Sequence, residues 1–352
     1  MLKLLIAVDK ARFSYMEKFS DELKKKGIES LLIDDLDIYS DSKLNKKYLR
    51  WTKTPEKVSK IIDEFKPDII LTERVSHFSS YVIKRKMPLI IFLRGDYWKE
   101  VEKENSNASN RSRLENIVKK NIAEKCFRNS TLILPICKYL ENIVKERYNG
   151  KSISVLYQGI ELSEWYEDKG MELKHPCVGF VQDANIWEKT KQMEILPQIL
   201  EELPNVNFYW AGDGKYAIKI FEQLKKYDNF HWLKRLEYPD GVRKFFSEID
   251  VYGLLTGMDM SPHTLLEASL MKKPIIATNV GGVSESCKDG ETCFLVNKDN
   301  ADEWISKIRL LFENETMREN MGNAGYSNVK ENFLWDKIVD DFIKILKLIK
   351  IN

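Results

Sequence analysis

The stretch from Asp250 to Val296 (DVYGLLTGMDMSPHTLLEASLMKKPIIATNVGGVSESCKDGETCFLV) constrains the fold more than any other part of this chain. DVYGLL has the length of a buried strand, TGMDMSP is a turn-rich loop, and Pro262 lies where a first helical turn tolerates proline. HTLLEASLM predicts a helix and PIIATN a second buried strand. Two strands joined through a helix form a βαβ unit, which binds ligands beyond the carboxyl ends of its strands. The stretch therefore predicts an α/β protein with a ligand site in the loop before the helix.

Two acids flank the start of the predicted helix. Asp259 lies in the loop, and Glu267 follows about two turns into the helix. Between them, the first backbone amides of the helix lack partners within it and favour an anion. Two carboxylates around such a site are suited to hold a sugar nucleotide by its hydroxyls at both ends. The other residues predicted to bind this ligand are Met260, Ser261, His263, Thr264 and Leu265.

The same stretch resembles the donor-binding motif of retaining GT-B-fold glycosyltransferases of family 4. In that motif an acid, seven residues and a glutamate precede an apolar strand and a GGV-E loop. Here these are Asp259, MSPHTLL, Glu267 and PIIATNVGGVSE. The resemblance implies that Asp259 contacts the hydroxyls of the donor sugar and Glu267 the ribose of the nucleotide. The alternative is an acid at a helix start together with an ordinary exposed glutamate.

Composition excludes several classes of protein. A chain of 352 residues is long enough for two domains, and its net charge of +2 is too small to indicate nucleic-acid binding. The five cysteines are scattered and the four histidines lack ligand spacing, so we expect reduced thiols and no metal site. The sequence shows no signal peptide or transmembrane run, which indicates a cytoplasmic protein.

The first half alternates apolar runs with helical patterns, which predicts a parallel sheet. Lys10 and Arg12 follow its first strand, where the family often carries a glycine pair, and are candidates to contact an acceptor. After the strand MPLIIFL come Arg94 and Asp96, candidates for catalysis, and Tyr97, a candidate for acceptor binding. Alternatively, Arg94 and Asp96 form a pair that only shapes the loop.

Residues 41–60 are basic and interleaved with aromatic and apolar side chains. They suit peripheral contact with the inner face of a membrane or with a lipid-linked acceptor, or else form a solvated surface segment, which we favour. The last helical pattern, with Ile338 and Phe342 on one face and lysines opposite, favours packing in a core over binding to a membrane.

The second half begins near SISVLYQGIELSEWY, which resembles the junction between the two domains of the family. This places an acceptor-side Rossmann-like domain at 1–163, completed by a C-terminal helix at 337–352 that crosses back to it. A donor-binding domain occupies 164–336, with a cleft between the two domains. After CVGFV, the family has an arginine and then a lysine, both of which bind the donor diphosphate. Gln182 or Phe180 occupies the place of the arginine; Lys191 aligns best as the lysine and Lys189 second.

These residues predict transfer of a sugar from a nucleotide-diphosphate donor to an unidentified acceptor, with retention of configuration. Lys191 and the helix start would stabilise the departing diphosphate, so no metal and no cofactor are expected. Acceptor classes that fit are a glycan, a lipid-linked sugar and a small molecule. Two alternatives stay open: an epimerase of the same fold that acts on the sugar nucleotide alone, and a non-catalytic protein that only binds it.

Overall fold

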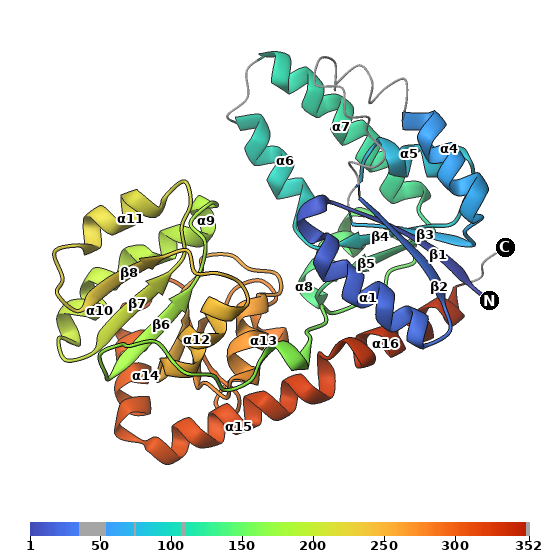
Figure 1. The fold of residues 1–352 in the computed structure, drawn as a ribbon. Coiled ribbons are helices and arrows are strands. Elements are labelled where there is room, and N and C mark those ends of the chain that lie inside the picture. Colours follow the sequence, from blue (N-terminus) through green and yellow to red (C-terminus); the bar gives the residue numbers. More distant parts are fainter. Residues whose placement is uncertain (35–53, 74, 107–109, 350–352) are drawn as a thin grey trace. The chain divides into compact units, whose positions relative to one another are not determined.

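The computed structural model describes residues 1–34, 54–73, 75–106 and 110–349. The chain divides into two units, each built on one parallel sheet (Figure 1). The first unit comprises Met1–Tyr157 and Trp335–Asn352, and the second comprises Gln158–Leu334. The predicted division after residue 163 lies a few residues later along the chain. Among the described helices, none combines the length and the apolar character needed to cross a membrane.

The sheet of the first unit has the strand order β2-β1-β3-β4-β5, and all its pairings are parallel. Its central strands are short apolar runs, and β4 (LIIFL) is buried at every position. A strand buried throughout has both of its faces covered, as parallel sheets require. The bounds are β1 Lys3–Val8, β2 Glu29–Asp34, β3 Ile69–Thr72, β4 Leu89–Leu93 and β5 Leu132–Pro135.

Helices connect these strands and cover the sheet (Figure 1). In α1, apolar residues recur at helical spacing, so that Met16, Phe19 and Leu23 are all buried. Of the basic stretch 41–60, residues 41–53 lie outside the described residues, and α4 begins at Thr54. The bounds are η1 Lys10–Arg12, α1 Phe13–Lys25, α4 Thr54–Phe65, α5 His77–Lys84, α6 Tyr97–Ser106, α7 Asn110–Asn129 and α8 Lys138–Arg147.

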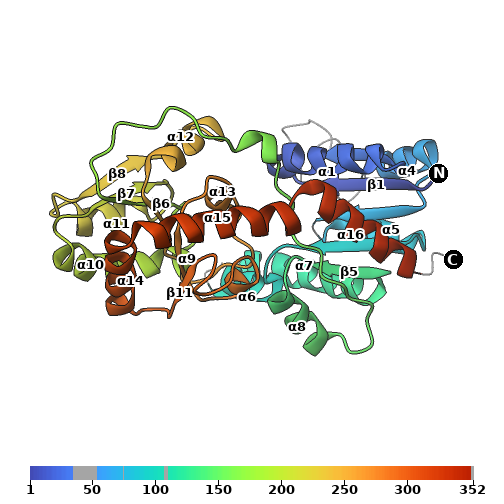
Figure 2. The ribbon, with the colours of Figure 1, turned by 90° about the horizontal axis from the view of Figure 1, so that it is seen from below.

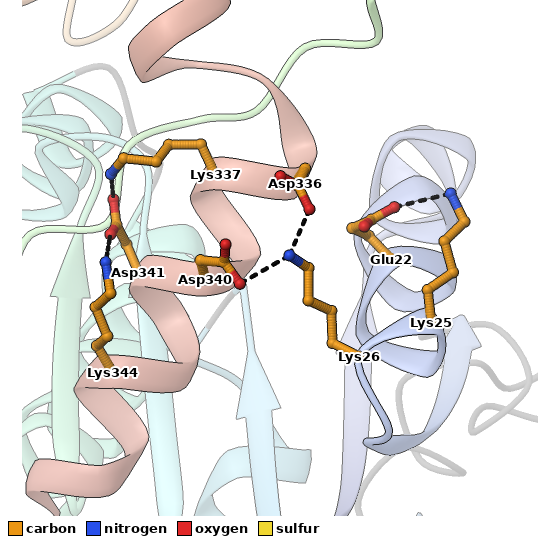
Figure 3. Close-up of polar contacts among 8 residues, drawn as sticks. All are labelled: Glu22, Lys25, Lys26, Asp336, Lys337, Asp340, Asp341 and Lys344. Atoms are coloured by element: carbon orange, nitrogen blue, oxygen red, sulfur yellow. Dashed lines mark hydrogen bonds and ion pairs between the residues drawn. The ribbon is translucent and has the colours of Figure 1, made fainter.

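The C-terminal helix α16, Trp335–Leu348, belongs to the first unit and packs against α1 (Figure 2). The rings of Phe342 and Phe19 meet edge to face, 5.3 Å apart between centroids, and Phe342 is fully buried. Burying such a side chain contributes about 1.5–3 kcal/mol. Lys26, just beyond α1, donates to Asp340 at 2.8 Å and pairs with Asp336 (Figure 3). The prediction that the last helix returns to the first domain is confirmed.

The second unit has a parallel sheet of order β11-β10-β9-β6-β7-β8. The chain starts in the middle with β6, builds outward to β8, and returns with β9 on the other side of β6. The order therefore reverses between β6 and β9, and at such a point in an open α/β sheet the loops beyond the strands diverge and leave room for a ligand. The bounds are β6 Cys177–Val181, β7 Asn207–Ala211, β8 Phe230–Lys234, β9 Val251–Leu254, β10 Ile275–Thr278 and β11 Phe294–Val296.

The helices of the second unit enclose a core that contains the fully buried Trp210 and Trp304. Its two connections to the first unit pair with each other, because the amide of Ile160 donates to the carbonyl of Phe333 at 2.9 Å. The bounds are η2 Leu162–Glu164, α9 Trp187–Thr190, η3 Lys191–Ile195, α10 Leu196–Glu202, α11 Ala217–Leu224, α12 Asp240–Glu248, α13 His263–Leu270, η4 Val283–Glu285, α14 Ala301–Glu313 and α15 Glu315–Asn332. The predicted α/β architecture with two Rossmann-like domains is confirmed.

Candidate active site

The loop after β9 holds Asp259 in a fixed position. Its Oδ1 accepts from the amide of Met260 at 2.8 Å, and its backbone carbonyl accepts from the amide of Gly282 at 3.0 Å. Gly281 has a φ of +57°, and a Cβ there would lie 2.0 Å from the Asp259 carbonyl oxygen. Only glycine fits this close approach, so the loop around Gly281 serves to hold the acid.

Lys189 at the end of α9 reaches the same acid. Its Nζ lies 2.7 Å from Oδ2 of Asp259, and both side chains are largely buried. The backbones are tied as well, since the amide of Gly257 donates to the Lys189 carbonyl at 3.1 Å. Lys191 passes the same loop, with its Cε 3.8 Å from where a Cβ of Gly257 would be. The structure thus brings both candidate lysines to the loop, and it is Lys189 that pairs with Asp259.

Glu267 is buried inside α13 with only 2% of its surface exposed. Its Oε1 accepts a hydrogen bond from the Tyr238 hydroxyl at 3.0 Å. Its Oε2 has no hydrogen-bond partner among the described residues. Burial, opposed by that single bond, raises the pKa of Glu267 to about 8. A buried carboxyl oxygen without a partner is costly unless a ligand supplies the missing donor.

The remaining residues at the start of α13 have distinct surroundings. The Tyr252 hydroxyl donates to the side chain of Thr264 at 2.6 Å, and the amide of Leu265 donates to the Pro262 carbonyl at 3.2 Å. The Leu265 amide is therefore engaged within the helix start. The carbonyl of Ser261 accepts a hydrogen bond from the side-chain amide of the buried Gln158 at 2.8 Å, and this bond helps to hold the loop in place. Met260 is buried, while His263 is half-buried.

Gln182 follows β6 directly and so lies at the point where the strand order reverses. Its amide donates to the Ala211 carbonyl at 3.0 Å, and its own carbonyl accepts from Trp210 Nε1 at 2.9 Å. Its side-chain Nε2 is buried and has no hydrogen-bond partner within the described part of the chain. Gln182 thus offers a neutral hydrogen-bond donor at the point where the strand order reverses.

The first-unit candidates are placed at the carboxyl edge of their own sheet. Arg94, after β4, forms an ion pair of 2.7 Å with Glu73, after β3, and its guanidinium lies 4.7 Å from the ring centre of Tyr15. Asp96 accepts from the amide of Lys99 at 3.1 Å and so caps α6.

Three further candidates belong to the first unit, namely Tyr97, Lys10 and Arg12. The ring of Tyr97 packs on Phe127 with centroids 5.6 Å apart. Lys10 and Arg12 are exposed in η1, which Asp9 caps by accepting from Ala11 at 2.9 Å. No contact here tests their acceptor roles, which stay predictions.

One contributor to the site was not singled out from the sequence. Tyr238 lies on the loop after β8 and supplies the hydroxyl that holds Glu267. The sequence carries no signal for it, because Tyr238 lies outside any apolar pattern and is 29 residues from Glu267.

Residues 168–328 match the family described as Glycosyl transferases group 1. Among curated relatives, MJ1178 of Methanocaldococcus jannaschii, an uncharacterized glycosyltransferase, is 27% identical over 60% of this chain and 58% of its own length. MJ1069 of the same organism, also an uncharacterized glycosyltransferase, is 26% identical over 80% of this chain and 75% of its own length. The match to MJ1178 thus spans little more than half of that relative.

Solved structures extend the likeness in fold to the whole chain. Sucrose-phosphate synthase of Thermosynechococcus elongatus superposes with a TM-score of 0.76 at 12% identity, covering 99% of this chain and 98% of its own. Anabaena Alr3699/HepE, solved in complex with UDP-glucose, gives a TM-score of 0.71 at 14% identity, covering 99% and 100%. The fold is GT-B, as predicted, and the comparisons support a transferase enzyme of the glycosyltransferase class, EC 2.4.

Proposed function

We infer that this glycosyltransferase transfers a sugar from a nucleotide-diphosphate donor to an acceptor hydroxyl, and that the donor binds in the second unit. The match to Glycosyl transferases group 1 supports the class of reaction, and the UDP-glucose complex of Alr3699/HepE supports the class of donor. One observation in this chain carries the proposal furthest. It is the buried carboxyl of Glu267, with one oxygen held by Tyr238 and the other lacking a partner.

A ribose supplies what Glu267 lacks. Its two neighbouring hydroxyls are hydrogen-bond donors, and a carboxylate accepts through both oxygens. Binding them stabilises the charged form of Glu267, which burial otherwise disfavours. We therefore assign Glu267 to the nucleotide end of the donor.

The sugar and diphosphate ends fall to the loop after β9. Asp259 is half-buried and accepts hydrogen bonds, which suits the hydroxyls of a sugar. Lys189 and Lys191 bring two positive charges to the same loop, and the amino end of α13 adds the positive end of its dipole. Preorganised positive charge stabilises the negative charge that develops on the leaving diphosphate in the transition state. Gln182 Nε2 adds a neutral hydrogen-bond donor there.

For the chemical step we propose attack of the acceptor hydroxyl on the anomeric carbon from the face that the diphosphate leaves. The bond from carbon to the diphosphate oxygen breaks as the bond to the acceptor forms, and the acceptor proton passes to the departing phosphate oxygen. This yields retention without a covalent enzyme intermediate. The anomeric configuration of the new glycosidic bond, read by nuclear magnetic resonance and compared with that of the donor, tests the predicted retention.

The binding assignment is tested by calorimetry with UDP and with UDP-sugars. Glu267→Ala should weaken both, because the ribose is common to both ligands, whereas Asp259→Ala should spare UDP and weaken the intact donor. Each lost hydrogen bond to a charged group is worth roughly 1.5–3 kcal/mol, or about 10- to 150-fold in affinity. Glu319→Ala, an exposed change on α15, is the matched control.

Unchanged UDP affinity in the Glu267→Ala variant would refute the ribose assignment. Analysis of the products separates the alternatives: an epimerase alters the sugar nucleotide without transferring it, and a protein that only binds shows tight donor binding with no turnover.

A further inference from the structure

A second group of polar side chains gathers at the amino ends of β6 and β9, the edge of the sheet opposite the candidate active site. Cys177 is the first residue of β6, Asp250 directly precedes β9, and His175 lies two residues before Cys177. Because β6 and β9 are neighbouring parallel strands, residues at their starts lie side by side. Glu248, the last residue of α12, completes the group. None of these residues has a part in the proposed transfer.

Three different ligand atoms converge here. The His175 Nδ1 lies 2.9 Å from Oδ2 of Asp250 and 3.7 Å from Sγ of Cys177, and all three atoms are within 4.8 Å of one another. Tetrahedral zinc, with Zn–N of about 2.0 Å and Zn–S of about 2.3 Å, needs about 3.6 Å between nitrogen and sulfur and about 3.4 Å between nitrogen and oxygen. The nitrogen–sulfur spacing therefore already fits. The nitrogen–oxygen contact has to open by about half an ångström, and the sulfur–oxygen spacing, which is within 4.8 Å, has to reach about 3.5 Å.

The surroundings hold these atoms in place. The His175 Nε2 lies 2.9 Å from Oε1 of Glu248, so the ring can donate there while Nδ1 faces the other two ligands. A carboxylate behind a histidine in this way orients the ring and raises its basicity in metal sites. The amide of Cys177 donates to Asp250 at 2.8 Å and orients that carboxylate.

The charges also balance. A thiolate and two carboxylates carry three negative charges, which a divalent ion and the nearby, half-buried Lys273 together neutralise. Lys273 is held apart from the ligand atoms, since its Nζ donates to the Ser247 carbonyl at 3.1 Å.

We propose that His175 Nδ1, Cys177 Sγ and the Asp250 carboxylate bind one zinc ion, with water as the fourth ligand. A mixed set of imidazole, thiolate and carboxylate suits zinc, and binding releases the proton of the thiol and that of Nδ1 to solvent. The ion fastens the segment before β6 to the start of β9. The site departs from the sequence-based expectation of no metal, because its third ligand lies 73 residues beyond the second.

The competing explanation uses the same atoms. A doubly protonated His175 would donate to Asp250 and Glu248 at once, and the two carboxylates do raise its pKa. That arrangement needs no thiol, whereas the zinc site requires Cys177. The thiol therefore separates the two explanations.

The test uses the full-length chain, freed of metal by dialysis against a chelator. Zinc is titrated by calorimetry, and cobalt(II) by absorption, because a thiolate ligand adds a charge-transfer band in the near ultraviolet. His175→Gln and Cys177→Ser remove ligands, and Glu248→Gln removes the carboxylate behind the ring. His77→Gln and Cys126→Ser, both in the first unit, are the matched controls.

We expect one ion per chain, with the thiolate band. Both should be lost in His175→Gln and Cys177→Ser and kept in the two controls, and Glu248→Gln should weaken zinc by about 10–100-fold. If Cys177→Ser fails to fold, His175→Gln carries the test, because that side chain is 41% exposed. Absence of zinc binding at millimolar concentration, a cobalt spectrum without the thiolate band, or unchanged binding in His175→Gln would each overturn the proposal.

Discussion

Replacing Glu267 with glutamine should stabilise the second unit at alkaline pH while weakening its affinity for nucleotide. The glutamine has the shape of the protonated acid, and its Oε1 can still accept from the Tyr238 hydroxyl. It never carries a charge, whereas the buried glutamate must ionise as the pH rises. The wild-type enzyme is therefore expected to lose stability with rising pH at this site, and the variant is not.

The sign and size follow from the pKa. Because the pKa in the folded protein is raised, the stability contributed by protonated Glu267 is full below about pH 4.5 and is lost as the pH rises through about 8. At about 1.4 kcal/mol per pH unit, the interval from 4.5 to about 8 sets an upper limit of about 5 kcal/mol. The free energy of unfolding of Glu267→Gln, relative to wild type, should rise by up to this amount between pH 4.5 and 8.5.

Hydrogen exchange of the buried amides of β9 and β10, followed against urea at both pH values, measures this free energy in the second unit alone. Glu319→Gln, an exposed change on α15, is the control and should behave as wild type. In parallel, UDP affinity should fall at least tenfold in Glu267→Gln, because an amide nitrogen cannot accept from a ribose hydroxyl. If the stability difference between Glu267→Gln and wild type is the same at both pH values, burial does not raise the pKa of this carboxyl. If Glu267→Gln binds UDP as tightly as wild type, the ribose assignment is refuted.

UDP affinity of the wild-type enzyme should rise with pH up to about 8, because binding favours the carboxylate of Glu267; calorimetry should find this slope absent in Glu267→Gln. Lys191→Ala should lower kcat/KM for the donor by removing positive charge near the leaving diphosphate, and steady-state kinetics equal to wild type would leave that role to Lys189. Turnover should persist in EDTA without gain from added magnesium or manganese; loss that either ion restores would contradict the leaving-group argument. Arg94→Met should lower the free energy of unfolding of the first unit by about 3–5 kcal/mol in urea, because it leaves the buried Glu73 carboxylate unpaired. Adding Glu73→Gln to the same chain should recover most of this loss. A loss of turnover with no loss of stability would instead make Arg94 functional.

The sequence was sufficient to predict the order of the elements and the positions of the two candidate acids on them. Runs such as LIIFL are apolar at every position, and a run of that kind is typical of a strand covered on both faces. Asp259 and Glu267 lie within one loop and helix, so their spacing along the chain already fixes where each is presented. These features depend on neighbours in sequence.

The partners of those residues could not be predicted in the same way. The sequence suggests Asp96, two residues away, as the partner of Arg94, but Asp96 caps α6 and Arg94 pairs with Glu73 at the end of the neighbouring strand. Likewise Lys189 reaches Asp259 across 70 residues. Parallel strands bring the residues that follow them to one edge of the sheet, and a single sequence does not state which strands are neighbours.

The return of α16 to the first unit has a consequence for the order in which the chain can fold. During translation, β1 to α8 are synthesised first and the whole second unit next. Only afterwards is α16 made, the helix that covers Phe19 and Met16 of α1. At about 5–20 residues per second, residues 158–334 take roughly 9–35 seconds to make. During that time the apolar side of α1 faces water, while the second unit, continuous in sequence, can close its core as it emerges. The half of the enzyme that is made first is therefore the half that is finished last, and a stop codon before Trp335 would remove part of the N-terminal unit.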